Sequence, residues 1–369
     1  MARRRDLRPH ARLLLPGLVL LLDPGVRAAS PGADADPLGQ ELARWVSYAE
    51  KNGSREELWT QVKGATGPAL TQAGDSLRAG RRLYALQRLA AARSSLAAFT
   101  YVDGRPAEER KDAARFEAEW RRMGRELGSD LGSPSPAALD GVAPAAVRAL
   151  GEVSLPQVRA YYESSLAYGR ATSPESGLFY LGSARAAREL VALCRQVSKP
   201  AGKPAPRLRS LDGALDDLET AVLAAYRPPA SIDRHAEFIA LGSALKEAHE
   251  LSALGLRHGA LLRYLSAVQR FASLKIGAEA LDASTAVERL EAWRARLARS
   301  GADHSIADLF LEAAEAERAG AAPGGPMPVA TAVVSDVLPR YLEALEPAAP
   351  HKPLPPAEVT VTLVRWPYT

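Results

Sequence analysis

The chain has 369 residues, of which 47% are hydrophobic and 24% charged, and its formal net charge is +4. Residues 1–28 hold six arginines and two aspartates, so the remainder carries equal numbers of basic and acidic side chains. This balance excludes the overall basic character typical of nucleic-acid-binding proteins, and we expect no nucleic-acid partner. A single cysteine forms no internal disulfide, so an apolar core must hold the fold.

The first 28 residues have the pattern of a cleavable signal peptide. Five arginines lie between Met1 and Arg12, an apolar run follows from Leu13 to Leu22, and Ala28 offers a small residue for cleavage. The run is too short to cross about 30 Å of hydrocarbon as a helix, which takes roughly 20 residues. The sequence predicts export to a periplasmic or extracellular location, with no transmembrane segment in the mature chain. The alternative is a short amphipathic start that is not cleaved.

Apolar residues recur at helical spacing along most of the chain. An example is the stripe formed by Leu42, Trp45, Val46 and Ala49. Ser54-Arg55-Glu56-Glu57 has the pattern of a capping box, in which a serine and a glutamate satisfy helix-end N–H groups. The sequence predicts early helices over about 41–51, 55–63, 75–101 and 105–127.

Loops rich in glycine, serine and proline divide the chain into three helical regions. The loops at 128–136 and 199–206 separate regions 36–128, 137–198 and 207–346, the last ending in a helix over about 329–345. Residues 357–365 differ, because β-branched and apolar residues alternate there and predict one C-terminal β-strand. We expect an all-α fold of antiparallel helical hairpins, packed as an irregular bundle or short solenoid, plus this strand. The strand either pairs with another protein or packs as a tail on its own domain.

Two patches, about 158–195 and 234–273, resemble degenerate tetratricopeptide repeats. In the first, Tyr161-Tyr162 precedes a turn with Pro174 and a helix that carries Leu181-Gly182. In the second, Leu241-Gly242 lies on a similar helix, and Gly255 marks the turn several residues later than the 34-residue repeat places it. The resemblance implies helix pairs that approach closely at small residues. Generic packing of helical hairpins is the alternative.

Side chains that carry catalytic or metal chemistry form no local motif. His235 and His249 share a helical face but lie roughly 21 Å apart along a helix, so one ion cannot bridge them. His258, beside the turn at Gly255, is the best placed histidine, and a surface or capping role is favoured even there. Asp216-Asp217 and Glu219 begin a helix, where they complement its dipole. We predict no metal, no cofactor and no catalytic residue.

The lone Cys194 lies in an apolar stretch, Leu190 to Cys194, and is interpreted as a buried structural thiol.

Two hypotheses about function remain. The first is an exported module that binds a protein or peptide in a groove lined by aromatic side chains, although core packing is the simpler role for each of them alone. These side chains are Tyr161, Tyr162, Tyr168, Phe179 and Tyr180. The second is an all-helical enzyme whose active residues are far apart in the sequence. A pocket lined by acids and histidine favours the enzyme, and a continuous aromatic surface favours the binding module.

Overall fold

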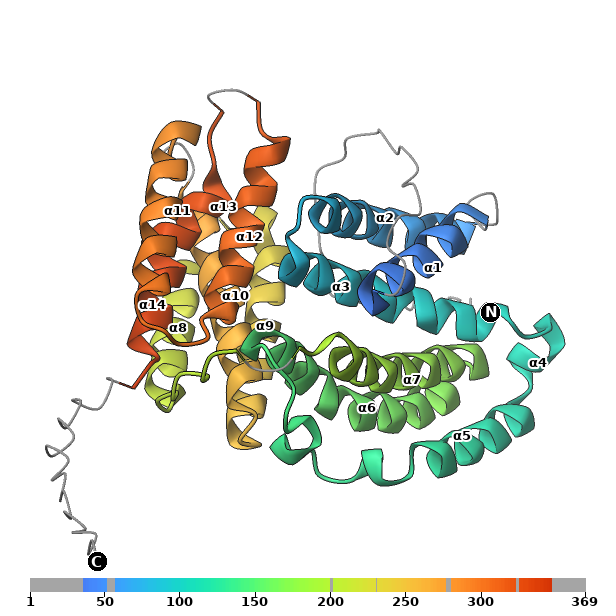
Figure 1. Ribbon diagram of the computed structural model, residues 1–369. Helices are drawn as coiled ribbons and strands as arrows, with labels where there is room; N and C mark the ends of the chain where they lie inside the picture. The colour runs from blue at the N-terminus through green and yellow to red at the C-terminus, as the bar shows by residue number, and fades with distance from the viewer. Residues whose placement is uncertain are drawn as a thin grey trace, which may run out of the picture.

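The computed structural model describes residues 36–51, 57–199, 202–229, 231–276, 280–322 and 325–346 (Figure 1). These residues form helices joined by loops and include no β-strand, which confirms the all-α class. Isolated β-bridges pair Leu208 with Leu345 and Asp282 with Pro326. The predicted signal peptide, the capping box at Ser54 and the strand at 357–365 lie outside the described residues. Within the described part, no helix combines the length and apolar character needed to cross a membrane.

The helices follow one another in the order predicted, with several boundaries shifted. In chain order they are α1 (Pro37–Lys51), α2 (Glu57–Arg78), α3 (Arg82–Asp103), α4 (Ala107–Lys111), α5 (Ala113–Leu127), η1 (Gly128–Leu131), η2 (Pro136–Leu139), α6 (Ala145–Ala171), α7 (Pro174–Val197), α8 (Asp212–Ala225), η3 (Ile232–Arg234), α9 (His235–Ala253), α10 (Arg257–Ile276), α11 (Ala283–Ala298), α12 (Ser305–Gly320), α13 (Pro328–Ala332), the π-helical η5 (Val333–Val337) and α14 (Leu338–Glu343).

Two of the predicted helices are in fact interrupted. The helix predicted over 75–101 breaks between α2 and α3, because Gly80 adopts φ +78°, a left-handed conformation that ends a helix. The helix predicted over 105–127 breaks at Asp112. The Asp112 carboxylate accepts hydrogen bonds from the backbone N–H groups of Ala114 and Arg115, at 2.8 and 3.1 Å, and so caps α5.

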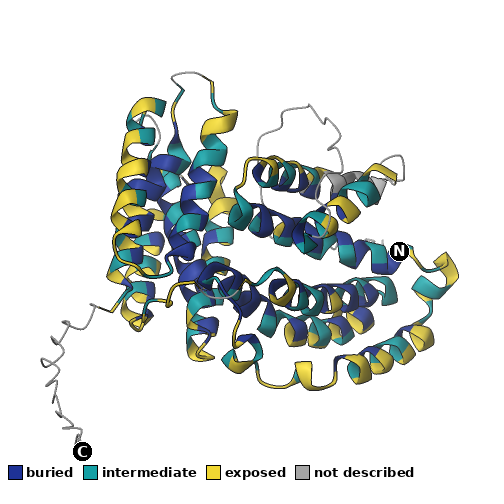
Figure 2. Ribbon diagram, viewed as in Figure 1, coloured by how far each residue is buried: buried dark blue, intermediate teal, exposed yellow. Residues whose placement is uncertain are grey.

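Helices α3, α6, α7 and α10 form the centre of the molecule. Helix α3 packs on α2 and α7, α6 packs on α7 and α10, and α9 packs on α10 (Figure 1). Buried residues concentrate on these central helices, whereas α5 and α11 carry many exposed ones (Figure 2). The central helices therefore position any surface that is built from several parts of the chain.

Helices α6 and α7 form a tight antiparallel hairpin. Gly169 near the end of α6 faces Gly177 near the start of α7, and Gly151 near the start of α6 faces Cys194 near the end of α7. The ring of Phe116 on α5 covers both glycines of the first pair, and a Cβ on either would lie within 2.4 Å of that ring. The absence of side chains at these two positions lets the three helices meet.

The two Leu-Gly pairs of the repeat-like patches pack differently. A Cβ on Gly182 of α7 would lie 2.7 Å from the Cβ of Tyr101 and 2.8 Å from the Cα of Ala98, both on α3. Gly242 of α9 is exposed, and a Cβ there would meet nothing within 4 Å. The close approach that the resemblance implies therefore occurs at Gly182 and not at Gly242.

Helix α12 supplies side chains that cap three other helices. Asp303 and Ser305, at its start, accept hydrogen bonds from the N–H groups of Ala145 and Ala146, the first residues of α6. Glu312 accepts from the N–H of Tyr84 in the first turn of α3 at 2.8 Å. Glu317 does the same for the start of α13, where it accepts from Val329 and Ala330. These bonds satisfy N–H groups that a helix leaves without an internal partner.

We predict that Gly182→Ala destabilises the protein by about 1–3 kcal/mol, because the new methyl group meets backbone atoms of α3 that cannot turn away. Gly242→Ala is the matched control, and it is expected to be neutral or to stabilise by up to about 1 kcal/mol, since alanine favours the helix. Urea unfolding followed by circular dichroism measures both. Equal effects of the two substitutions would contradict the packing described here.

Candidate functional site

Four of the five predicted aromatic side chains lie together on the α6–α7 hairpin. The rings of Tyr168 and Tyr180 stack with centroids 4.5 Å apart, Tyr161 lies 6.3 Å from Tyr180, and Phe179 meets Tyr180 edge-on at 6.2 Å. Tyr161 and Tyr168 are seven residues apart on α6 and share one helical face. We call these four residues the aromatic surface.

Tyr162 does not belong to this surface. It stacks on Trp120 of α5 with ring centroids 4.9 Å apart, and its hydroxyl donates to the Trp120 carbonyl oxygen at 3.3 Å. Neighbouring residues on a helix point in different directions, so Tyr161 and Tyr162 serve different contacts. Tyr162 helps to hold α5 against α6.

The aromatic surface is accessible at one end and enclosed at the other. Tyr168 is 45% exposed, whereas Phe179 and Tyr180 are half-buried. Burial, together with the hydrogen bond and the charge of Tyr168, raises the pKa of Tyr180 to about 12. Burial raises the pKa of Tyr161, and the charge of Glu247 raises it further, while Arg263 and Ser94 lower it. The aromatic surface therefore runs from the exposed Tyr168 to the half-buried Tyr161.

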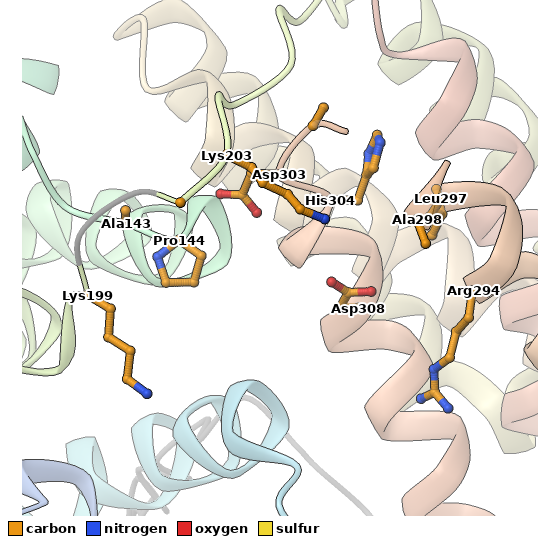
Figure 3. A pocket seen from close by; sticks show the side chains of 12 residues that line it. Ala143, Pro144, Lys199, Lys203, Arg294, Leu297, Ala298, Asp303, His304 and Asp308 are labelled. Atoms are coloured by element: carbon orange, nitrogen blue, oxygen red, sulfur yellow. The ribbon is translucent and has the colours of Figure 1, made fainter. Parts of the chain in front are cut away.

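A separate cavity of about 480 Å³ lies where the start of α6 meets α11 and α12. Figure 3 shows Pro144 and Lys199 on one side of it and Arg294 on the other. Asp308 lines the cavity, and no described residue hydrogen-bonds its carboxylate. Burial raises the pKa of Asp308, and nearby Asp303 raises it further, while Arg294 and Lys203 lower it.

The other acid and the histidine of this cavity are already engaged. Asp303 accepts from the N–H groups of Ala145 and Ser305 at 2.7 and 2.9 Å. His304 is buried, with Nδ1 at 2.8 Å from the Tyr341 hydroxyl and Nε2 bonded to the Ser300 hydroxyl. These two side chains hold helix ends together, which leaves Asp308 as the one unengaged acid among the residues lining the cavity.

The remaining described histidines have structural contacts. His258 lies 3.4 Å from the buried carboxylate of Glu152, which also accepts from Arg148 and from the N–H of Gly259. The Nδ1 of His235 lies 2.8 Å from the Tyr226 hydroxyl. We expected a surface or capping role for His258, and its ring contacts Glu152, which joins α10 to α6. His351 lies outside the described residues.

One group of possible metal ligands has no recognisable spacing in the sequence. Asp216 and Glu219 of α8 and His249 of α9 each place one ligand atom within 4.8 Å of the others. The acids are three residues apart on one helix, but the histidine is 30 residues further along the chain, so no local spacing marks the group. Both carboxylates are exposed, whereas the Nε2 of His249 is buried, lies 3.6 Å from the Glu219 carboxylate and has no hydrogen-bond partner among the described residues.

Cys194 is fully buried, as predicted for a structural thiol, and burial raises the pKa of that thiol to about 12.

Comparison with protein-family models, curated proteins and solved structures finds no match to this chain.

The acids of α12 make stability depend on pH. Burial raises the pKa of Glu312 to about 7, above its ordinary value of 4.5, despite the N–H groups of Tyr84 and Leu83 that it caps. A carboxyl whose pKa is higher in the folded chain stabilises the fold at low pH, and this contribution is lost as pH rises through about 4.5–7.

We predict that Glu312→Gln, which keeps an acceptor oxygen for α3, gains stability over the wild type as pH rises from 5 to 8, by on the order of 2 kcal/mol. Urea unfolding at several pH values measures the difference in unfolding free energy between the two proteins. Both proteins share the other titrating groups, so the contributions of those groups cancel in this difference. A difference that stays constant over this range would contradict the raised pKa of Glu312.

Proposed function

We propose that this chain is an exported helical module that binds a protein or peptide partner through the aromatic surface. The signal-peptide pattern of residues 1–28 supports export. The resemblance of two patches to tetratricopeptide repeats supports a binding role by analogy at the level of the fold alone.

The observation that carries this proposal is the stacked pair Tyr168–Tyr180 at the molecular surface. A partner that covers this pair removes apolar ring area from water at little cost in side-chain entropy, because the two rings already hold each other in place. Tyrosine is among the residue types that dominate binding energy in protein interfaces. The hydroxyl groups add hydrogen bonds at the rim of the same contact.

The contacts of two histidines, His258 and His304, favour recognition over catalysis at these residues. Catalysis needs an acid, base or nucleophile that is free to reach a substrate. His258 is bound to Glu152, and both ring nitrogens of His304 have hydroxyl partners. The one cysteine is sealed in the core.

A second candidate function is a small-molecule reaction or binding event in the cavity beside α12. Its volume suits a small ligand, and Asp308 presents a carboxyl with a raised pKa. Asp308 is the one acid of the lining without a hydrogen-bond partner among the described residues, and Lys199 and Lys203 line the same cavity. We favour the binding module, because it rests on four aromatic side chains that contact one another.

We predict that a partner captured by the full chain in cells of its source organism is lost when Tyr168 and Tyr180 are both changed to alanine. Leu223→Ala, at a leucine that is 67% exposed on α8, is the control for non-specific apolar capture. Binding of the purified partner should weaken by about tenfold or more in the tyrosine variant, since a truncated interface tyrosine typically costs over 1 kcal/mol. Circular dichroism establishes that the variants remain folded.

Partner binding that survives the double substitution would contradict the proposed role of the aromatic surface.

The same samples test export, because mass spectrometry of the purified chain identifies its first residue. An intact Met1 in a cytosolic fraction would contradict the predicted signal peptide.

The cavity hypothesis has its own prediction. Asp308→Asn should stabilise the protein at neutral pH by on the order of 1 kcal/mol, because it removes a carboxylate that burial disfavours. If the cavity serves a ligand instead, a co-purifying small molecule identified by native mass spectrometry should be lost from this variant. Retention of such a molecule would exclude Asp308 from its binding.

A further inference from the structure

Two carboxylates and one imidazole converge between helices α8 and α9. Asp216 and Glu219 lie three residues apart on α8, and His249 lies on α9. One ligand atom of each lies within 4.8 Å of the other two, and the Nε2 of His249 is 3.6 Å from the Glu219 carboxylate. We call these three residues the α8–α9 trio. They are side-chain types that bind divalent transition metals in proteins.

The Nε2 atom of His249 is buried and has no hydrogen-bond partner among the described residues. Its distance of 3.6 Å to the Glu219 carboxylate exceeds the roughly 2.7–3.2 Å of an N–H···O hydrogen bond. A buried polar atom without a partner costs free energy, so such an atom in a folded protein calls for an explanation. A metal ion supplies the missing partner, because neutral imidazole binds metals through a ring nitrogen.

The two carboxylates of the trio form no ion pair with a lysine or arginine among the described residues. The neighbouring acids of α9 are paired in this way. Glu247 lies 2.7 Å from the Nε of Arg263, and Glu250 lies 3.8 Å from the Nζ of Lys246. Two carboxylates held close together repel each other, and a divalent cation between them removes this repulsion.

The dipole of α8 does not account for these two acids. Helix α8 begins at Asp212, so Asp216 lies about one turn and Glu219 nearly two turns past its first residue. The favourable effect of a helix start on negative charge is limited to the first turn. The role expected from the sequence therefore belongs to Asp212, and the two acids of the trio need another explanation.

Contacts at both ends of the α8–α9 pair hold the trio in place. At the start of α8, the Ser252 hydroxyl donates to the Asp212 carboxylate at 3.1 Å. Just past the end of α8, the Tyr226 hydroxyl lies 2.8 Å from the Nδ1 of His235. Leu215, next to the first acid of the trio, is fully buried. The trio is thus built on two helices whose relative position is fixed, as a metal site requires.

We propose that the α8–α9 trio binds one divalent transition-metal ion, and that Zn²⁺ fits it best. Zinc lies about 2.0–2.2 Å from imidazole nitrogen and carboxylate oxygen, so its tetrahedral ligand atoms are roughly 3.3–3.6 Å apart. The Nε2 of His249 and the Glu219 carboxylate already have this separation. The remaining ligand atoms need to approach by at most about 1.5 Å, which exposed carboxylates achieve by rotation about side-chain bonds.

The composition of the trio also selects among metals and sets the coordination. Mg²⁺ and Ca²⁺ are disfavoured, because they prefer ligand sets made of oxygen alone. Three protein ligands leave a fourth tetrahedral position, which water fills because Asp216 and Glu219 are exposed. A bound ion ties α8 to α9, and a site made from two helices explains why no local motif predicts it. The aromatic surface lies on α6 and α7, so zinc binding does not depend on the proposed function.

The first test titrates Zn²⁺ into the chelator-treated full chain and measures binding by isothermal titration calorimetry. His249→Gln and Glu219→Gln should each weaken binding by more than about tenfold, the lower end of the loss seen when an outer partner of a ligand is removed. Asp217→Asn and His235→Gln are the matched controls, because they remove an exposed acid of α8 and an exposed histidine of α9 outside the trio. Both controls should bind zinc as the wild type does.

The second test measures melting temperatures by circular dichroism, which also establishes that the variants are folded. Zinc should raise the melting temperature of the wild type by about 3–5 °C when the free ion reaches about 100 times its dissociation constant, and should not raise that of His249→Gln. Mg²⁺ at the same concentration should have no effect. Without metal, Glu219→Gln should be at least as stable as the wild type, because it removes the repulsion between two carboxylates.

Three outcomes would overturn the inference: no zinc binding by the wild type, equal zinc binding by the trio variants and the control variants, or tighter binding of Mg²⁺ or Ca²⁺ that His249→Gln leaves unchanged. A metal-free Glu219→Gln that melts below the wild type, together with no effect of zinc on either protein, would identify the trio as a surface ion pair and would overturn the inference as well.

Discussion

The fold depends on satisfying the backbone N–H groups at the starts of its helices. Each helix leaves four such groups without internal partners, and burial makes them costly. The structure meets this need at three helices with side chains from one place, the start and inner face of α12: Asp303 and Ser305 for α6, Glu312 for α3, and Glu317 for α13. Helix α12 thereby ties the first helices of the chain to the last ones. Because Glu312 and Glu317 cap other helices, they are partly buried, and this burial raises the pKa values of both carboxyl groups.

Helix α3 packs on α2 and α7. It carries two buried arginines, Arg88 and Arg93, whose surroundings differ. Arg93 is enclosed by acids from α1 and α7 and holds these helices together. Arg88 is also buried, but its Nε and Nη2 atoms have no hydrogen-bond partner among the described residues. Two tyrosines of α6 also differ in their surroundings, since Tyr162 packs against Trp120 while Tyr168 remains exposed. Tyr162 and Tyr168 thus lie on different faces of α6.

The sequence predicts those features that depend on neighbouring residues. Helical periodicity gave the all-α class, and the turn at Gly255 and the buried Cys194 were anticipated from local pattern. The local pattern predicted two continuous helices that are in fact interrupted by a single residue. These residues are Gly80, which ends α2, and Asp112, which caps α5. The local pattern also failed where contacts join distant segments. Glu312 and Tyr84 are 228 residues apart, and nothing near either residue indicates the bond between them. The aromatic surface was partly predictable, because Tyr161 and Tyr168 share a helical face, whereas the contacts of Tyr180 with both need α6 and α7 to be paired first.

The most direct test of this account replaces Tyr168 with the photoreactive benzoylphenylalanine and cross-links the full chain in its source organism. Peptide sequencing of the cross-linked product then identifies which segment of the partner lies on the aromatic surface. The account predicts one defined segment of a protein partner, and no such product when the photoreactive group replaces Leu223. Cross-linking of the same segment from both positions, or no specific product from position 168, would contradict it.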